Sequence, residues 1–315
     1  MRVYLSLTKL YARSFYNLPG KGAPGAKPDA KAIAKFAGFA LLALLVIGQM
    51  GALFVMVNMT MYEALAPAGL QGLLLLNAAA MATALTLAIG FLTALSTYFL
   101  NDMELQLLAM PIKPRDLFAA KFTSLYLSEA AISLFFMASV MVIFGIKESP
   151  HPLMYLWGTL AGLCLPLPAL ALSYFVQVPL MSGARFLRNK QAILLIGGIL
   201  GIGLALGFNL YFQSTLSRVG DPAWIAEHMA GPDALLTRMG KAYPPALFAW
   251  RSMSEPASAQ ALLSALGMLS FCAAGPALAV LILSKPYARS LIGFNEAHIK
   301  KMGAQGASEF IRTRI

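Results

Sequence analysis

The sequence predicts an all-α, polytopic membrane protein with six transmembrane helices. Its mean hydropathy is +0.71, and only 12% of its residues are charged, whereas about a quarter are charged in soluble domains. Six apolar runs each reach the roughly 20 helical residues that cross a hydrocarbon core. Continuous apolarity, rather than alternation, favours helices over the strands of a barrel. The runs are approximately 36–58, 70–100, 122–145, 153–181, 191–213 and 259–284.

The positions of the basic residues predict the orientation of these helices. Lys and Arg number seven in 1–35, three in 101–121, three in 182–190 and six in 285–315, against none, one and four in 59–69, 146–152 and 214–258. The positive-inside rule then places both termini and the first four of these segments in the cytoplasm, with the protein in the inner membrane. We attribute the net charge of +11 to orientation and to anionic lipid rather than to nucleic acid.

The chain accordingly divides into three parts. Residues 1–35 form a cytoplasmic interfacial helix and a linker, 36–284 the six-helix transmembrane domain, and 285–315 a cytoplasmic tail. Residues 2–18 are expected to lie on the membrane surface, because apolar and polar side chains follow helical spacing on opposite faces. The apolar face holds Val3, Leu7, Tyr11, Phe15 and Leu18, and the polar face holds Arg2, Ser6, Lys9 and Arg13.

The second run carries small and hydroxyl residues at spacings of three and four. They are Thr83, Thr86, Gly90, Thr93 and Thr97. Small residues at this spacing let helices approach closely and form hydrogen bonds across the contact. We favour a packing seam as the interpretation, and the alternative is a weakly polar wall of a transport path.

The fourth run predicts an interrupted helix. It has Gly158 and Gly162, which favour close helix contact, followed by Pro166, Pro168 and Pro179, which should kink the helix. The outer loop, 214–258, is expected to hold two short helices at the outer interface. Their predicted starts are Asp221-Pro222 and Gly231-Pro232, and Gly240 is the predicted stop.

The sequence predicts no catalytic, cofactor-binding or metal-ligating residue. The three histidines, His151, His228 and His298, are scattered without metal-ligand spacing. Neither a nucleophile elbow nor a phosphate-binding loop of the Walker A type occurs. The chain is therefore not expected to be an enzyme, and any ATP that powers it must be hydrolysed by a partner chain.

Glu129 is the one acidic residue placed clearly inside a predicted span, seven residues past the start of the third run. An intramembrane ionisable residue suggests a proton relay or substrate site. Relays need partners, however, and no second buried charge is visible in the sequence. At a depth of ~10 Å, Glu129 could also reach the interface or bond a neighbouring helix. We favour this structural role.

A dense polar segment, residues 101–121, joins the second and third runs. Asp102 and Glu104 can cap and charge a helix N-terminus. Leucines then give a short apolar face, Pro111 and Pro114 break the run, and Asp116 can start the next helix. We expect a short amphipathic helix followed by a stiff turn, parallel to the membrane and exposed to the cytoplasm.

This segment resembles the permease subunits of type-2 ABC transporters, which carry an acidic pair, a leucine-rich turn, a Pro-Ile step with basic residues, and a lysine at the next span. The matching residues are Asp102, Glu104, Leu105, Leu108, Pro111, Ile112, Lys113, Arg115, Asp116 and Lys121. The resemblance implies a coupling helix that docks into a separate ATPase subunit, which binds ATP and Mg²⁺. The loop at 182–190 could add a second contact through Arg185, Arg188 and Lys190, although topology determination alone explains these bases.

The resemblance further implies a transport path between two six-span units. We expect an exporter that moves an unidentified substrate by alternating access, although the sequence does not indicate the direction of transport. Many permeases of this kind contain two such halves, and this chain has one. Either two copies pair, or the sequence is the first half of a longer protein. The alternatives are a nucleotide-independent carrier or channel that uses Glu129 and the threonine face, and a scaffold without transport activity.

Overall fold

The computed structural model describes residues 2–15, 30–69, 71–99, 107, 110, 112–183 and 243–312, and these residues form helices and turns without any strand. The predicted all-α class is confirmed for this part of the chain. The elements are α1 (Arg2–Phe15), α2 (Ala30–Leu65), the 3-10 helix η1 (Ala66–Ala68), α3 (Leu73–Phe99), α5 (Pro114–Glu148), α6 (Pro152–Cys164), α7 (Pro166–Gly183), α11 (Pro244–Ser254) and α12 (Ala259–Arg312).

Four stretches of helix are long and apolar enough to cross a membrane. They are Leu73–Leu95, Pro114–Glu148, Pro152–Pro179 and Ala259–Ser290. These correspond to the second, third, fourth and sixth predicted runs. The first run lies in α2, where the structure describes a shorter apolar helix at Gly51–Leu65, and the fifth run lies outside the described residues.

The third predicted span begins earlier than expected. The third apolar run of the sequence starts at residue 122, directly after Lys121. Helix α5 instead begins at Pro114 and continues to Glu148. Its first turns already bury Leu117 and Phe118, so the helix enters the bundle before the sequence becomes uniformly apolar.

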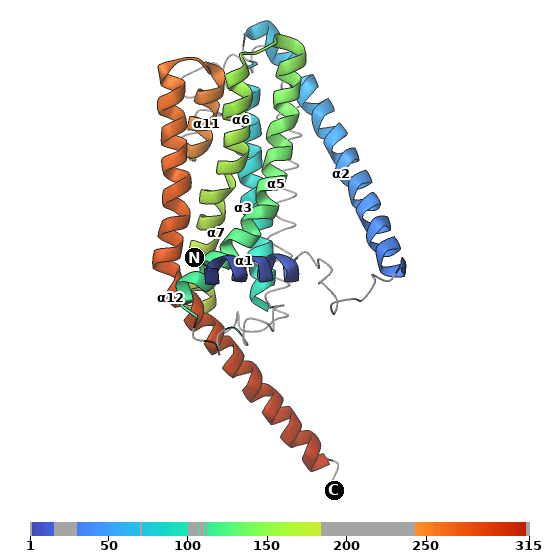
Figure 1. Cartoon of the computed structure of the whole chain (residues 1–315), viewed down its shortest axis with the longest axis vertical. Helices are drawn as coiled ribbons and strands as arrows, with labels where there is room; N and C mark the ends of the chain where they lie inside the picture. Colours follow the sequence, from blue (N-terminus) through green and yellow to red (C-terminus); the bar gives the residue numbers. More distant parts are fainter. Residues whose placement is uncertain are drawn as a thin grey trace.

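The spans lie side by side as a bundle (Figure 1). Helix α5 contacts α1, α2, α3, α6, α7 and α12. Helix α2 meets the bundle at one end and diverges from it at the other, and α12 continues beyond the ends of the other helices (Figure 1).

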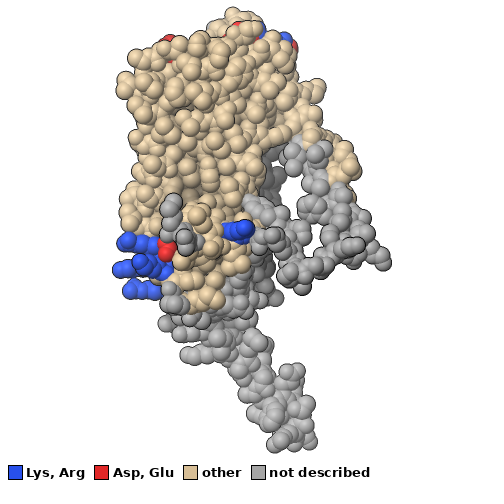
Figure 2. Space-filling view, viewed as in Figure 1, with Lys and Arg blue, Asp and Glu red and all other residues tan. Residues whose placement is uncertain are grey.

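Charged side chains gather at the two ends of the bundle. At the basic end, where α5 begins, the described exposed cations include Lys9, Lys113, Arg115, Lys285 and Arg289. At the opposite end α2 and α5 stop, and Lys147 Nζ lies 3.4 Å from Glu63 Oε1. Figure 2 shows an uncharged band between the two ends of this face. A surface without charges is what contact with lipid requires.

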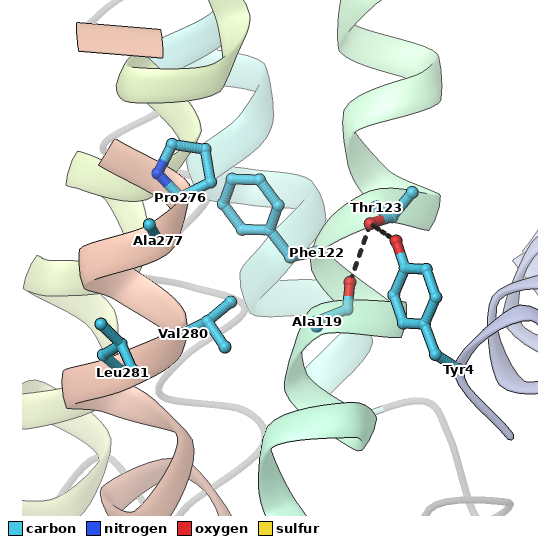
Figure 3. A pocket seen from close by; sticks show the side chains of 8 residues that line it. All are labelled: Tyr4, Ala119, Phe122, Thr123, Pro276, Ala277, Val280 and Leu281. Atoms are coloured by element: carbon cyan, nitrogen blue, oxygen red, sulfur yellow. Dashed lines mark hydrogen bonds between the residues drawn. The ribbon is translucent and has the colours of Figure 1, made fainter. Parts of the chain in front are cut away.

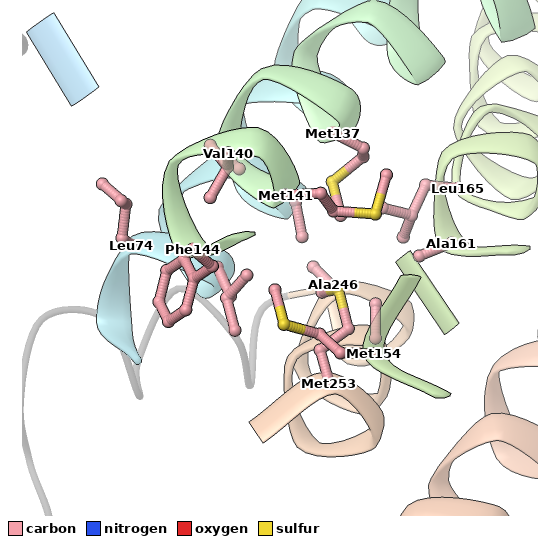
Figure 4. Close-up of a cluster of buried hydrophobic side chains, with 14 of the residues drawn as sticks. Leu74, Met137, Val140, Met141, Phe144, Met154, Ala161, Leu165, Ala246 and Met253 are labelled. Carbon is pink, nitrogen blue, oxygen red and sulfur yellow. The ribbon is translucent and has the colours of Figure 1, made fainter. Parts of the chain in front are cut away.

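The buried side chains form two clusters along the bundle. The methionine cluster lies toward the opposite end (Figure 4) and contains Met61, Met137, Met141, Met154, Met253 and Met268. The aromatic cluster lies at the basic end and contains Tyr11, Phe118, Phe122, Tyr174 and Tyr287.

Prolines interrupt the fourth span, as the sequence predicts. Helix α6 ends at Cys164, α7 begins at Pro166, and Leu165 forms the turn between them. Proline has no N–H and its ring clashes with the preceding turn, so Pro166 ends the hydrogen-bond ladder of α6. Pro179 lies inside α7 without ending it.

The predicted close contact at Gly158 and Gly162 is confirmed. A Cβ on Gly162 would lie 3.2 Å from the backbone Cα of Leu134, and one on Gly158 would collide with the sulfur of Met141. Both positions face α5. Glycine therefore sets the distance between α5 and α6.

Helix α1 runs across the bundle at the basic end (Figure 1). Of its predicted apolar face, Leu7 and Tyr11 are buried in the cluster with α5, whereas Val3 is 52% exposed. Tyr4 Oη and Thr123 Oγ1 share a hydrogen bond of 2.7 Å. Part of the apolar face of α1 therefore packs against the bundle and part of it is exposed. The sequence predicted that the whole face would lie on the membrane surface.

Helix α11 differs from the expected outer loop. The predicted starts at 221 and 231 and the stop at Gly240 lie outside the described residues. Helix α11 begins at Pro244 and packs against α12, α3 and α6. Trp250 Nε1 donates a hydrogen bond of 2.9 Å to Gly72 O. This part of the loop is an inserted helix.

Candidate coupling segment and intramembrane polar groups

The segment 101–121 enters α5 at the basic end. Asp102, Glu104, Leu105, Leu108 and Pro111 lie outside the described residues. Leu107 is 5% exposed within the aromatic cluster, whereas Met110 is 54% exposed. Met110 N donates to Leu107 O at 3.2 Å, which forms a turn. The segment is therefore anchored to the bundle at Leu107 and presents an apolar side chain outward at Met110.

The first turn of α5 carries the described polar residues of this segment. Pro114 occupies the first helical position, where its fixed φ suits a helix and its missing N–H costs nothing. The helix starts two residues before the predicted start at Asp116. Lys113 and Arg115 are exposed and Asp116 is half-buried. Asp116 stabilises the helix by placing negative charge near its N-terminus.

Lys121 is not on this surface. Its side chain is 1% exposed, and its Nζ donates a hydrogen bond of 2.5 Å to Tyr287 Oη on α12. Nζ also lies 5.0 Å from the centroid of the Tyr287 ring, within the range of a cation–π contact. In this structure Lys121 joins α5 to α12 instead of facing a partner, which differs from the role that the resemblance implies for it.

Glu129 is fully buried at the contact between α5 and α3. Its Oε1 lies 3.5 Å from Thr93 Oγ1, whose hydroxyl also donates to Ile89 O at 2.9 Å, and its Oε2 has no hydrogen-bond partner among the described residues. A Cβ on Gly90 would lie 3.7 Å from the carboxyl group. Glu129 thus makes a weak polar contact with a neighbouring helix, α3.

Glu129 also lies far from the start of α5. Because α5 starts at Pro114, Glu129 is about 22 Å along the helix, at 1.5 Å per residue. This is too far for a glutamate side chain to reach the basic end. Lys121, eight residues earlier on α5, is the second buried ionisable group that sequence reasoning missed.

The threonine face of α3 behaves as a packing seam. Thr83 and Thr86 are buried, and their hydroxyls donate to the carbonyls of Ala79 and Ala82 at 2.8 and 2.9 Å. Hydroxyls bonded to their own helix offer little to a transported solute. Thr93 is the member that reaches another helix, and nothing is described of the side chain of Thr97. Arg185, Arg188 and Lys190 lie outside the described residues.

The break between α6 and α7 is closed by side chains from three other segments. Tyr126 Oη donates to Leu163 O at 2.8 Å, Cys272 Sγ to Cys164 O at 3.1 Å, and Tyr243 Oη to Leu165 O at 3.1 Å. The usual donor to Cys164 O would be the N–H of residue 168, which is a proline. In lipid, a freed carbonyl must find an internal donor. The carbonyl that Pro168 frees at the break therefore has a side-chain donor, Cys272.

Among the residues that the structure describes, no group of three His, Cys, Asp or Glu side chains could hold a metal ion. Comparison of the chain with family models, with curated proteins and with solved structures finds no match. The fold and these sites define a helical membrane protein. It has buried polar groups within its bundle and exposed basic residues at one end, where α5 begins.

Proposed function

We propose that the chain is the membrane-spanning permease subunit of an ATP-driven transporter of the type-2 ABC class, and an exporter. A separate ATPase subunit binds the segment 101–121 and pushes on α5, and the spans rock between inward-open and outward-open states. The proposal includes six spans, cytoplasmic termini and a second six-span unit, either a second copy or a further half.

The contacts of α5 with the rest of the bundle carry this proposal. Its first turn is exposed at the basic end, and the helix contacts six other elements of the bundle. A displacement of that turn would therefore reach most of the spans through direct packing. The turn is also stiff, because Pro114 fixes one backbone angle.

Recovery of an ATPase with the solubilised chain tests the function. The tagged chain is extracted from native membranes in a mild detergent, and co-purifying ATPase is identified by its Walker motifs and by vanadate-sensitive hydrolysis. We expect Arg115→Glu to reduce its recovery severalfold. Arg251→Glu is the matched control, because Arg251 is an exposed arginine near the end of α11. Equal recovery with both variants, or no ATPase at all, contradicts the proposal.

Labelling of single cysteines tests the orientation. Both cysteines of the native sequence are buried, so the background from a membrane-impermeant maleimide should be low. Lys113→Cys should react in inverted vesicles and Lys147→Cys in right-side-out vesicles. The reverse pattern would place the segment 101–121 outside and rule out its contact with a cytoplasmic ATPase.

A nucleotide-independent carrier is the second candidate, because Glu129 is fully buried and its Oε2 has no described partner. Solute transport driven by an ion gradient in liposomes without ATPase, and lost in Glu129→Gln, would support the carrier. A scaffold would neither transport solute nor recover an ATPase.

A further inference from the structure

A groove of about 460 Å³ runs between α5 and α12 beside α1 (Figure 3). Ala119 lies on the α5 side and Ala277 on the α12 side, and Val280 and Leu281 extend the apolar wall. The small side chains of the two alanines leave the space between the helices open. The groove is therefore a feature of the lateral surface rather than of the bundle interior.

The polar atoms at the groove are already bonded to each other. Thr123 Oγ1 donates to Ala119 O at 2.9 Å and shares a 2.7 Å hydrogen bond with Tyr4 Oη (Figure 3). The groove offers carbon atoms and no free donor. Its occupant should be an apolar chain.

Cations flank the groove at its end nearest the basic end of the bundle. Arg115 precedes Ala119 by four residues on α5, and Lys285 follows Leu281 by four on α12. Residues four apart lie above one another on one helix face. Both side chains are exposed, Arg289 follows one turn later, and the acid beside them is Asp116. Three cations and one acid leave this end of the groove positive.

We propose that this groove binds an anionic phospholipid, with one acyl chain between α5 and α12 and the phosphate between Arg115 and Lys285. Cationic side chains beside an apolar surface near the membrane interface attract anionic head groups. The crosswise helix α1 lies at the same end and closes the groove through Tyr4. A second copy of the chain is disfavoured, because eight side chains line the groove, whereas a stable interface uses about 20–30 residues from each partner.

Native mass spectrometry of the full chain in detergent tests the lipid site. The probes are palmitoyl-oleoyl phosphatidylglycerol and palmitoyl-oleoyl phosphatidylcholine, and the readout is the number of lipids retained per chain. We expect tighter retention of the phosphatidylglycerol. Lys285→Gln should lower this preference roughly fivefold, the contribution of one cation near a membrane surface. Arg251→Gln is the matched charge control and should retain the preference.

A second pair of variants tests the apolar part of the groove. Ala277→Phe should lower retention of both lipids at least threefold, while Ala274→Phe, an exposed alanine of α12 outside the groove lining, should not. Leu281→Asn repeats the test without added bulk, in case Ala277→Phe fails to fold. Glycerol 1-phosphate should not compete, because it lacks the acyl chain.

Equal retention of the two lipids by the native chain would overturn the proposal, as would full retention by the folded Ala277→Phe or Leu281→Asn variants. Competition by glycerol 1-phosphate would identify a phosphate site without an acyl chain. A change from dimer to monomer in Ala277→Phe would show that a second copy occupies the groove. Either of these last two results would also overturn the proposal that a phospholipid occupies the groove. None of these outcomes depends on an ATPase.

Discussion

The two buried clusters are built from different side chains, although both use α5. The aromatic cluster at the basic end has five buried rings and no methionine. Among the described residues, the methionine cluster at the opposite end has six buried methionines and two buried rings, Tyr62 and Phe144; further rings pack against it only partly buried, those of Phe54, Trp157, Tyr243, Phe248 and Trp250. Aromatic rings have two rotatable bonds and prefer defined ring-to-ring geometries. Methionine has three rotatable bonds and adapts to irregular gaps.

This difference gives the bundle one stiff end and one adaptable end. At the basic end, the Phe118 ring lies 5.1 Å from that of Tyr174 and 5.2 Å from that of Tyr287, both at steep angles. The buried Lys121 adds a directional bond to the same group. A push delivered at the start of α5 would move this end as one body. The helices at the methionine cluster could then repack without losing contact.

The largest expected effect is at the centre of the aromatic cluster. Phe118→Ala should lower the free energy of unfolding by about 3 kcal/mol, because the cavity removes contacts with three rings. Reversible unfolding in bicelles by added SDS, followed by circular dichroism, measures this change. A loss below about 1 kcal/mol would mean that the cluster collapses into the cavity, and the basic end would then not be stiff.

The bond between Lys121 and Tyr287 should have the next largest effect. Tyr287→Phe removes one acceptor of the Lys121 ammonium and should cost about 2 kcal/mol, as expected for a bond to a charged group. Lys121→Met in that background should restore most of the stability, because the buried charge is gone. Tyr155→Phe, an exposed tyrosine of α6, is the control. Additive effects of the two substitutions would contradict the coupling.

Features that depend on one residue type could be predicted from the sequence. The prolines predicted the break after Cys164, and the glycines predicted the contact of α6 with α5, because the steric reason lies in the residue itself. Apolar length predicted the four described spans. The charge pattern predicted which residues would share the basic end.

Features that depend on contacts between distant residues could not be predicted. Lys121 stands at the edge of an apolar run, where a lysine can either extend toward the interface or be buried. Its partner Tyr287 is 166 residues away. The donor that Cys272 supplies to Cys164 O is 108 residues away. From the sequence, both cysteines behave as small apolar residues. Cys272 becomes a donor only because α12 packs against the break between α6 and α7.

The joint between α6 and α7, whose Cys164, Leu165 and Cys272 belong to the methionine cluster, should respond to the loss of a single donor. Cys272→Ala leaves Cys164 O without its described donor and should cost about 1 kcal/mol, since a thiol is a weak donor and the carbonyl remains buried. Cys272→Ser keeps a donor and should be close to the native chain. Unfolding in SDS compares the two variants with Ser270→Ala, an exposed hydroxyl on the same helix. Equal stability of the alanine and serine variants would show that the carbonyl needs no side-chain donor.

The smallest effect is expected in the methionine cluster. Met137 is fully buried on α5, and Met137→Leu keeps its volume, so the cost should stay below about 1.5 kcal/mol. Phe118→Leu changes the shape of a buried side chain on the same helix and should cost more, because leucine cannot reproduce the edge-to-face ring contacts. The same SDS titration compares the two variants directly. Equal costs would mean that both clusters are equally rigid, and the repacking that alternating access requires would then have to occur elsewhere in the chain.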